Sequence, residues 1–350
     1  MPSPEQRLRA QAQLHHAWLL GLMLMVVTRK GAELTGEWMF RLFRRQHLNK
    51  FLSSFQKLGL DHLPHAVACA QYHVLSNQVG GVRVEFMAEH DRKAWLRFRY
   101  PRWMYAGPTI CAMPIDVSRG FLRGWYAHNG VSLGNPRLGF VCVSEDMSDE
   151  FGLCGYFKEF DDPLEEDERL QFSDELPPAF KAAEQPHLPP EQWNPERLAQ
   201  AQRSYALEYL RNGISELIDL LGASETLELA SRSARLIGMQ YYQETAEQLG
   251  ERDGSIDDAA AFLTSLLQGM VDEIEPLRSA DPPQAGPSIK ELRIKGLRIT
   301  RGLSETEASI VGTAWCGLAQ GAIRAHQQLM QLSSQEEASG ALLWRVTALV

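Results

Sequence analysis

The chain has 350 residues, of which 44% are hydrophobic and 23% are charged, and its formal net charge is −9. Its length exceeds the size at which one hydrophobic core keeps growing, so two domains are expected. The acidic balance argues against a nucleic-acid-binding surface that covers the whole chain. The five cysteines have no C-x-x-C spacing. They indicate neither a disulfide framework nor a zinc site, and a reducing cytoplasm is predicted.

Residues 17–27 form the longest apolar run near the N-terminus. The run is about half of the roughly 20 residues that span a bilayer. Thr28, Arg29 and Lys30 follow directly, where a signal peptide would have small residues for cleavage. The run therefore predicts a buried helix, and no membrane partner is expected.

A basic helical stretch follows. Seven Lys or Arg residues face two acids between Arg29 and Lys57. Such a surplus would suit an anionic partner or nucleic acid. A solvated helix face, or one docked on the acidic segment 145–175, is the favoured interpretation. A nucleic-acid partner is therefore not expected.

The central stretch predicts a small sheet. Residues 81–87 and 94–100 alternate apolar and charged side chains, which is typical of a hairpin with one buried face. Pro101 and Pro108 end the second strand. A helix capped by Asp116 or Ser118 is predicted to run to about residue 128. Further strands are predicted at 138–143 and 156–160.

The second half predicts the same order of elements. Strands are expected at 296–300 and 308–313, a helix at 315–330 and a last strand at 341–347, and an exposed loop is expected at 281–287. Upstream, residues 31–59 and 222–250 align without a gap, both opening Gly-Ala and closing Leu-Gly. We interpret this as an internal repeat; the alternative is two ordinary helix pairs of similar length.

The predicted fold is α+β with two similar lobes, each a helical hairpin plus a small antiparallel sheet with one packed helix. The first lobe spans 1–175 and includes an acidic edge at 145–175, whose acids match no EF-hand loop. Residues 176–195 contain six prolines and form the predicted linker. The second lobe spans 196–350.

Neither a nucleotide-binding motif nor a metal site is indicated. G-x-G-x-x-G and the P-loop pattern are both absent. His62 and His65, and the adjacent His15 and His16, have no clear third ligand. The sequence identifies no cofactor.

Polar residues at the ends of the first lobe's elements form the candidate site, because such ends converge on one edge. We predict Arg102 as a substrate anchor, His128 as the proton-transfer group and Asn129 or Asn135 as the residue that polarises a carbonyl. The predicted substrate-binding residues are Trp103, Tyr126, Asn135, Arg137 and Cys111.

The alternative interpretation is structural. Trp103, Trp125 and Tyr126 would then be core residues, and His128 would be a helix-end histidine whose charge is favoured by the helix dipole. Cys142, in the middle of a predicted strand, is interpreted as a buried structural thiol.

Each half resembles the domain of 4-vinyl reductase-type ligand-binding modules, and it is similar to L-2-amino-thiazoline-4-carboxylate hydrolases. The segments that carry the resemblance are 119–125 (RGFLRGW) with 138–143 (LGFVCV), and 318–324 with 342–346. No diagnostic catalytic motif is present to transfer. The paired copies and the 101–114 insertion depart from the family pattern.

The function predicted from these observations is hydrolysis of a non-peptide C–N bond in a small organic acid or heterocycle. The alternative is a non-catalytic module that binds or senses a small ligand. The expected partner is a small molecule, and homo-oligomerisation is left open.

Overall fold

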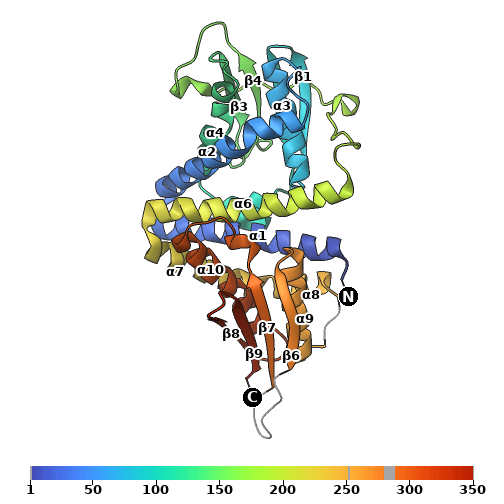
Figure 1. Cartoon of the computed structure of the whole chain (residues 1–350). Helices are drawn as coiled ribbons and strands as arrows, with labels where there is room; N and C mark the ends of the chain where they lie inside the picture. Colours follow the sequence, from blue (N-terminus) through green and yellow to red (C-terminus); the bar gives the residue numbers. More distant parts are fainter. Residues whose placement is uncertain (1, 251–252, 280–287, 350) are drawn as a thin grey trace. The chain divides into compact units, whose positions relative to one another are not determined.

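The computed structural model describes residues 2–250, 253–279 and 288–349, so the loop expected at 281–287 lies outside the described residues. The chain is a mixed α+β protein with two small sheets, as predicted (Figure 1).

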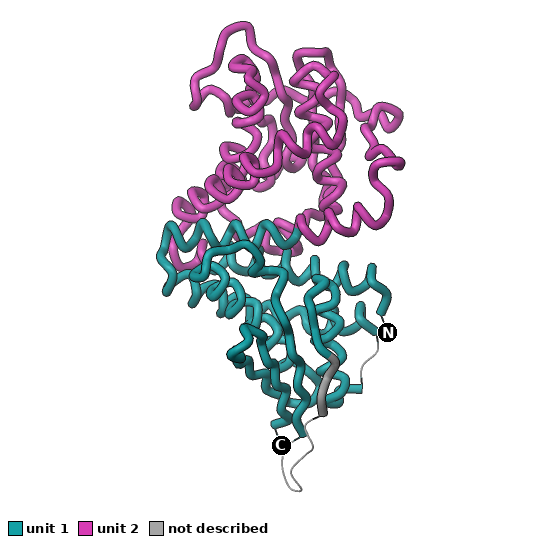
Figure 2. The backbone as a smooth tube through the Cα atoms, viewed as in Figure 1, with its two compact units in different colours: residues 1–25, 206–350 teal, residues 26–205 magenta. Residues whose placement is uncertain are grey.

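The chain forms two compact units, unit 2 from residues 26–205 and unit 1 from residues 1–25 with 206–350 (Figure 2). These boundaries differ from the predicted lobes, because the first 25 residues belong to unit 1 and the predicted linker belongs to unit 2. The two long helices explain the difference: α1 (Pro4–Lys30) and α6 (Pro195–Leu221) each contribute to both units. Helical periodicity marks the buried face of a helix but not the core that it joins.

Unit 2 has a five-stranded sheet of order β1-β2-β4-β3-β5, antiparallel except for the β3/β5 pair. The predicted hairpin and the predicted strands at 138–143 and 156–160 are confirmed. The elements are α2 (Ala32–Lys57), α3 (His65–Val79), β1 (Val84–His90), β2 (Lys93–Phe98), η1 (Trp103–Tyr105), η2 (Gly107–Cys111), α4 (Ile115–Gly124), η3 (Tyr126–His128), α5 (Asn129–Ser132), β3 (Leu138–Ser144), β4 (Cys154–Glu159), η4 (Asp167–Arg169), β5 (Leu170–Phe172) and η5 (Ala182–Glu184).

The helix expected to run to about residue 128 is shorter. Pro114 occupies the N-cap position, so neither Asp116 nor Ser118 caps α4. The helix ends at Gly124, and a separate turn of 3-10 helix follows it. Residues 126–128 therefore do not continue the face of α4.

Unit 1 has a four-stranded antiparallel sheet of order β6-β7-β9-β8. The strand expected at 341–347 is confirmed. Besides the parts of α1 and α6 in this unit, the elements are α7 (Ala223–Gln240), α8 (Tyr242–Gln248), α9 (Ile256–Gly269), β6 (Glu273–Ser279), β7 (Ile289–Gly296), η6 (Arg298–Thr300), α10 (Glu305–Arg324), β8 (Met330–Glu336) and β9 (Leu342–Ala348).

The strands expected at 296–300 and 308–313 are wrong. Residues 298–300 form a 3-10 turn, and 308–313 lie inside α10. Ser304 and Glu307 form a capping box that starts this helix, so its β-branched residues follow a helix start signal. The hairpin lies earlier in the chain, at β6 and β7.

In both sheets the first four strands lie in the same spatial order, first, second, fourth and third in sequence. The sheet of unit 2 has β5 as an additional strand. A pair of helices also recurs, α2 with α4 and α7 with α10. A Cβ atom at Gly120 would lie 2.3 Å from the Gly36 carbonyl oxygen, and one at Gly321 would lie 2.0 Å from the Arg235 carbonyl oxygen. The same element order supports the internal repeat, and in each helix pair a glycine of the second helix meets the backbone of the first.

The apolar run 17–27 lies within α1. Within unit 1 the Trp18 indole donates hydrogen bonds to the Ala230 carbonyl and to Ser233 Oγ, both at 3.2 Å. Among the described residues α1 is the one helix long and apolar enough to span a membrane, and 61% of its apolar window is buried. The predicted buried helix is thus observed.

Candidate functional site

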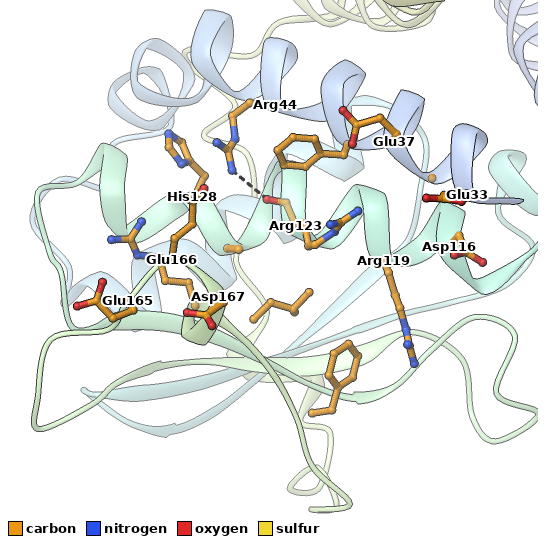
Figure 3. Close-up of a pocket in the computed structure, with 16 residues that line it drawn as sticks. Glu33, Glu37, Arg44, Asp116, Arg119, Arg123, His128, Glu165, Glu166 and Asp167 are labelled. Atoms are coloured by element: carbon orange, nitrogen blue, oxygen red, sulfur yellow. Dashed lines mark hydrogen bonds between the residues drawn. The ribbon is translucent and has the colours of Figure 1, made fainter. Parts of the chain in front are cut away.

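A groove of about 1040 Å³ lies in unit 2, between α2, α4 and the segment 165–172 (Figure 3). Close helix packing creates its wall, because Gly36 and Gly120 let the two helices approach each other at backbone distance. Residues 33, 37, 40 and 44 form one stripe along α2, and residues 116, 119 and 123 form another along α4. The charged or titratable side chains of the lining are Glu33, Glu37, Arg44, Asp116, Arg119, Arg123, His128, Glu165, Glu166, Asp167 and Arg169.

Arginine guanidinium groups converge on this groove. Arg44 donates to the Gly124 carbonyl at 3.0 Å and to the Arg123 carbonyl at 3.1 Å. The guanidinium carbons of Arg44 and Arg123 lie 5.1 and 5.4 Å from the centre of the Phe40 ring. Arg169 donates to the Leu164 carbonyl at 3.4 Å.

The ion pairing of these arginines is incomplete. Arg119 makes a two-point contact with Glu145, at 3.1 and 3.0 Å. For Arg44, Arg123 and Arg169, in contrast, no carboxylate of the described chain lies within ion-pair distance. Three positive charges therefore line the groove with no direct carboxylate partner.

His128 lies beside this group. Partial burial, and then the positive charges of Arg44 and Arg169, lower the pKa of His128 to about 4, although Glu166 acts in the opposite direction. The His128 ring packs edge-on against the ring of His47 at 5.1 Å. His128 is therefore neutral at neutral pH and is able to accept a proton.

Acidic side chains occupy both ends of the groove. Glu165, Glu166 and Asp167 lie on the His128 side, while Glu33, Glu37 and Asp116 lie at the opposite end (Figure 3). Glu37 is paired with Arg41 at 2.7 Å. At Arg44 the basic helix α2 thus faces the acidic segment 145–175. This agrees with the interpretation that the basic face of this helix docks on that segment.

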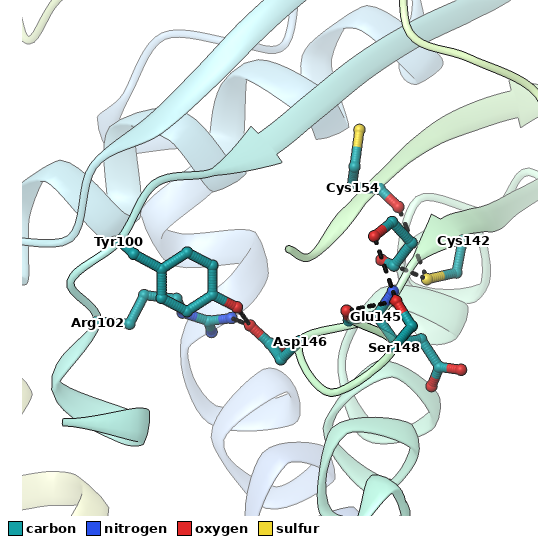
Figure 4. A network of polar contacts seen from close by, with 8 residues as sticks. Tyr100, Arg102, Cys142, Glu145, Asp146, Ser148 and Cys154 are labelled. Carbon is teal, nitrogen blue, oxygen red and sulfur yellow. Dashed lines mark hydrogen bonds and ion pairs between the residues drawn. The ribbon is translucent and has the colours of Figure 1, made fainter. Parts of the chain in front are cut away.

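Of the eight predicted site residues, only His128 lines the groove. Arg102 is buried and forms an ion pair with the buried Asp146 at 2.5 Å (Figure 4). Its guanidinium lies 4.1 Å from the Phe98 ring. Burial by itself would lower the pKa of Arg102, but the Asp146 carboxylate raises it above its ordinary value. The structure thus places the predicted substrate anchor Arg102 away from the groove, with its charge neutralised by Asp146 inside the protein.

Asn129 and Tyr126 belong to the core. Asn129 is fully buried, with its side-chain nitrogen 3.0 Å from His73 Nε2. The Tyr126 ring stacks on the His73 ring at 3.9 Å. The break after Gly124 turns residues 126 and 129 inward, so the structural interpretation holds for Tyr126, and Asn129 does not reach the groove.

The remaining predicted residues lie elsewhere. Asn135 contacts Glu159 at 2.9 Å, and Arg137 lies 3.6 Å from the same carboxylate. Trp103 is half-buried in η1, and Cys111 is exposed in η2; neither lines the groove. Cys142 is buried, and burial raises the pKa of its thiol, as expected for a structural cysteine.

The sequence analysis missed the groove arginines and Phe40. A signal was present, since 33, 37, 40 and 44 follow helical spacing and Arg119 and Arg123 flank Gly120. The basic helix was expected to be solvated or to dock on the acidic segment 145–175, but the groove itself was not predicted, because residues 165–172 are distant in sequence from α2 and α4. In the described part of the chain no cluster of three or more His, Cys, Asp or Glu side chains could hold a metal ion.

No family model matches the chain, and no curated protein matches it.

Proposed function

We propose that unit 2 is a binding module for a small organic acid, which it holds in the groove between α2, α4 and residues 165–172. The observation that supports this most directly is the set of three guanidiniums, Arg44, Arg123 and Arg169, without a carboxylate partner in the described chain. Guanidinium groups bind carboxylates through two parallel hydrogen bonds. A carboxylate is thus the group that this end of the groove suits best.

The size and lining of the groove fit a small ligand. Its volume of about 1040 Å³ is at the upper end of small-molecule sites. Phe40, Leu170 and Phe172 supply apolar surface for a ring or a short carbon chain. At the other end, Glu33 and Asp116 suit a basic nitrogen. An organic acid that also carries an amine or amidine is therefore the favoured ligand, which agrees with the resemblance to amino-thiazoline carboxylate hydrolases.

A titration followed by calorimetry tests the proposal. The probes are 2-amino-thiazoline-4-carboxylate, its carboxamide and benzoate. We expect the carboxylate to bind at least tenfold more tightly than the carboxamide, because a charged hydrogen-bonded pair contributes about 1.5–3 kcal/mol. Equal affinities would contradict the carboxylate site.

A hydrolase is the second candidate, and the position of His128 favours it. The ring lines the groove, and its lowered pKa leaves it neutral at neutral pH, so that a ring nitrogen is able to accept a proton. Among the described residues that line the groove there is no Ser, Thr, Cys or Lys, and the hydrolase candidate uses water as the nucleophile. Water would attack the carbon of the C–N bond while His128 accepts its proton, and the nitrogen would leave after receiving that proton. Arg44 or Arg123 would anchor the carboxylate in place of Arg102.

Turnover separates the two candidates. If the protein is a hydrolase, it releases product from 2-amino-thiazoline-4-carboxylate, and His128→Gln removes turnover while the affinity for substrate changes little. If it is a binding module alone, the same compound binds and is recovered unchanged. The pH profile adds a check, since a general base with a pKa near 4 loses activity only below about pH 4.

A further inference from the structure

Strand β1 is the outer strand on one side of the sheet in unit 2, so one of its edges has no neighbouring strand among the described residues. One side chain contacts this edge. The Gln185 amide accepts a hydrogen bond from the Phe86 backbone N–H at 2.9 Å and donates one to the Phe86 carbonyl at 2.8 Å. Gln185 thus reproduces, at a single residue, the pair of bonds that a neighbouring strand would make.

Along β1 the backbone N–H and C=O groups of successive residues point alternately toward β2 and toward the outer edge, which shows which other residues face outward. The Arg99 N–H donates to the Arg83 carbonyl at 2.9 Å, so Arg83 faces β2. Phe86 faces outward, because its backbone bonds to Gln185. Val84 lies between them, two residues before Phe86, so its N–H and carbonyl face the same open edge. In the described chain no hydrogen bond reaches this edge at Val84.

A second groove, of about 440 Å³, lies at this point. Its lining includes Val82, Val84 and the side chains of Phe180 and His187, which come from the segment that carries Gln185. The Phe180 side chain is 45% exposed. We call residues 180–187 the strap. The groove therefore combines open strand edge with an apolar wall, and it is separate from the groove of the proposed function.

The charge at the mouth of this groove is positive. Arg83 and Arg99 both line it. Glu85, the acid beside them, is held by Arg97 at 2.7 Å, and Arg99 lies 3.6 Å from it. For Arg83, no carboxylate of the described residues lies within ion-pair distance. One guanidinium is thus available for a carboxylate, and a second lies next to it.

We propose that this groove binds the C-terminal end of an extended peptide, which adds to the edge of β1 at Val84 and places its carboxylate on Arg83 and Arg99. Backbone hydrogen bonds at a strand edge supply affinity for any extended sequence, and the terminal carboxylate selects a chain end. Gln185 occupies the next outward position, at Phe86, so only the last one or two residues of the peptide pair with the strand and the rest of the peptide leaves the edge there. The terminal carboxylate, held by the arginines, is what makes the site select a chain end.

The test uses the full chain and a fluorescein-labelled pentapeptide, Gly-Ser-Val-Thr-Val, with either a free C-terminal carboxylate or a C-terminal amide. Fluorescence anisotropy is expected to show binding of the acid and a loss of roughly tenfold or more for the amide, the effect of one charge-assisted contact. Equal affinities, no binding of either peptide at millimolar concentration, or displacement of the acid peptide by equimolar acetate would overturn the proposal.

Two variants locate the site. Val84→Pro removes the outward N–H, and proline is tolerated at the first residue of an edge strand, so the fold should persist while peptide binding is lost. Arg83→Gln with Arg99→Gln should make the acid and the amide bind equally. Gln185→Ala frees the next position on the edge and should increase the affinity of a longer peptide. Unchanged binding in Val84→Pro would contradict strand addition, and if that variant does not fold, the arginine pair and Gln185→Ala decide.

Discussion

The guanidinium of Arg102 and the carboxylate of Asp146 form an ion pair inside unit 2, at 2.5 Å, with both side chains buried. Tyr100 also donates its hydroxyl hydrogen to Asp146 (Figure 4). Inside the unit this pair connects the loop after β2 to the loop after β3.

Removing one partner of this pair should destabilise unit 2 strongly. Asp146→Ala leaves the Arg102 charge buried without its counter-ion, which typically costs about 3–5 kcal/mol. Urea unfolding measures the loss. Asp161→Ala is the matched control, because the Arg92–Asp161 pair is exposed and exposed pairs contribute less than about 1 kcal/mol. Similar effects in the two variants would contradict the assignment.

Arg123→Gln should weaken the binding of organic acids while the fold persists. Arg123 is exposed, lines the groove and contacts the Phe40 ring, so its charge serves the groove more than the core. We expect roughly a tenfold loss of carboxylate affinity, consistent with one charged hydrogen bond. Arg137→Gln, an exposed arginine away from the groove, should leave the affinity unchanged.

Glu166→Gln should have the opposite effect. Glu166 acts electrostatically on both Arg44 and His128, and it would repel an incoming carboxylate. Removal of its charge should raise carboxylate affinity several-fold, and the gain should shrink at high salt because exposed charges are screened. A loss of affinity would show that Glu166 contacts the ligand directly.

Gly120→Ala should destabilise unit 2, because the new Cβ atom would lie 2.3 Å from the Gly36 carbonyl oxygen. Forcing a methyl group into such a contact typically costs about 1–3 kcal/mol. Gly321→Ala places a Cβ atom 2.0 Å from the Arg235 carbonyl oxygen in unit 1. If the helix pairs are equivalent, thermal unfolding should show comparable losses in the two variants. A neutral effect in either would argue against packing of that helix pair at backbone distance.

Stability should fall below about pH 6.5, and His15 is one cause. Trp315 donates to His15 Nε2 at 3.2 Å, which requires a neutral ring. Burial, and then the neighbouring His16, lower the pKa of His15 to about 3. The unfolded chain binds a proton near pH 6.5 and the folded chain does not, so this histidine's contribution to stability is complete above pH 6.5. It is lost as the pH falls toward 3, by roughly 1 kcal/mol per pH unit.

His15→Gln tests that contribution. Glutamine keeps a hydrogen-bond acceptor for Trp315 but does not titrate. The free energy of unfolding, measured from pH 7 to pH 4, should therefore depend less steeply on pH in the variant than in the unchanged protein. Equal slopes would show that His15 does not contribute to the acid sensitivity.

The sequence predicts the parts of this fold that depend on local patterns. Alternation located the first hairpin, and the unbroken apolar run 138–143 located β3. The same reading failed at 308–313, where β-branched residues outweighed the capping box at Ser304 and Glu307. The sequence could not predict that residues 1–25 of the chain, which include most of α1, belong to unit 1. Helical periodicity shows which face of a helix is buried, but it does not identify the elements against which that face packs.

The candidate site was harder to predict because it is assembled from distant segments. His128 was found because it ends an element, as an acid–base residue often does. Arg102 and Asn129 met the same criterion, but both side chains turn inward to buried partners, Asp146 and His73. Whether an element-end residue faces solvent or core depends on partners that only the folded chain brings together.

The proposed binding of a carboxylate by the groove arginines is tested most directly by NMR. The Nε–H signals of Arg44, Arg123 and Arg169 are followed while benzoate is added, with Arg137 as an internal reference away from the groove. The account predicts saturable shifts of the three groove signals and no saturable shift of Arg137. Shifts that are equal at all four arginines, or absent from the three in the groove, would contradict it.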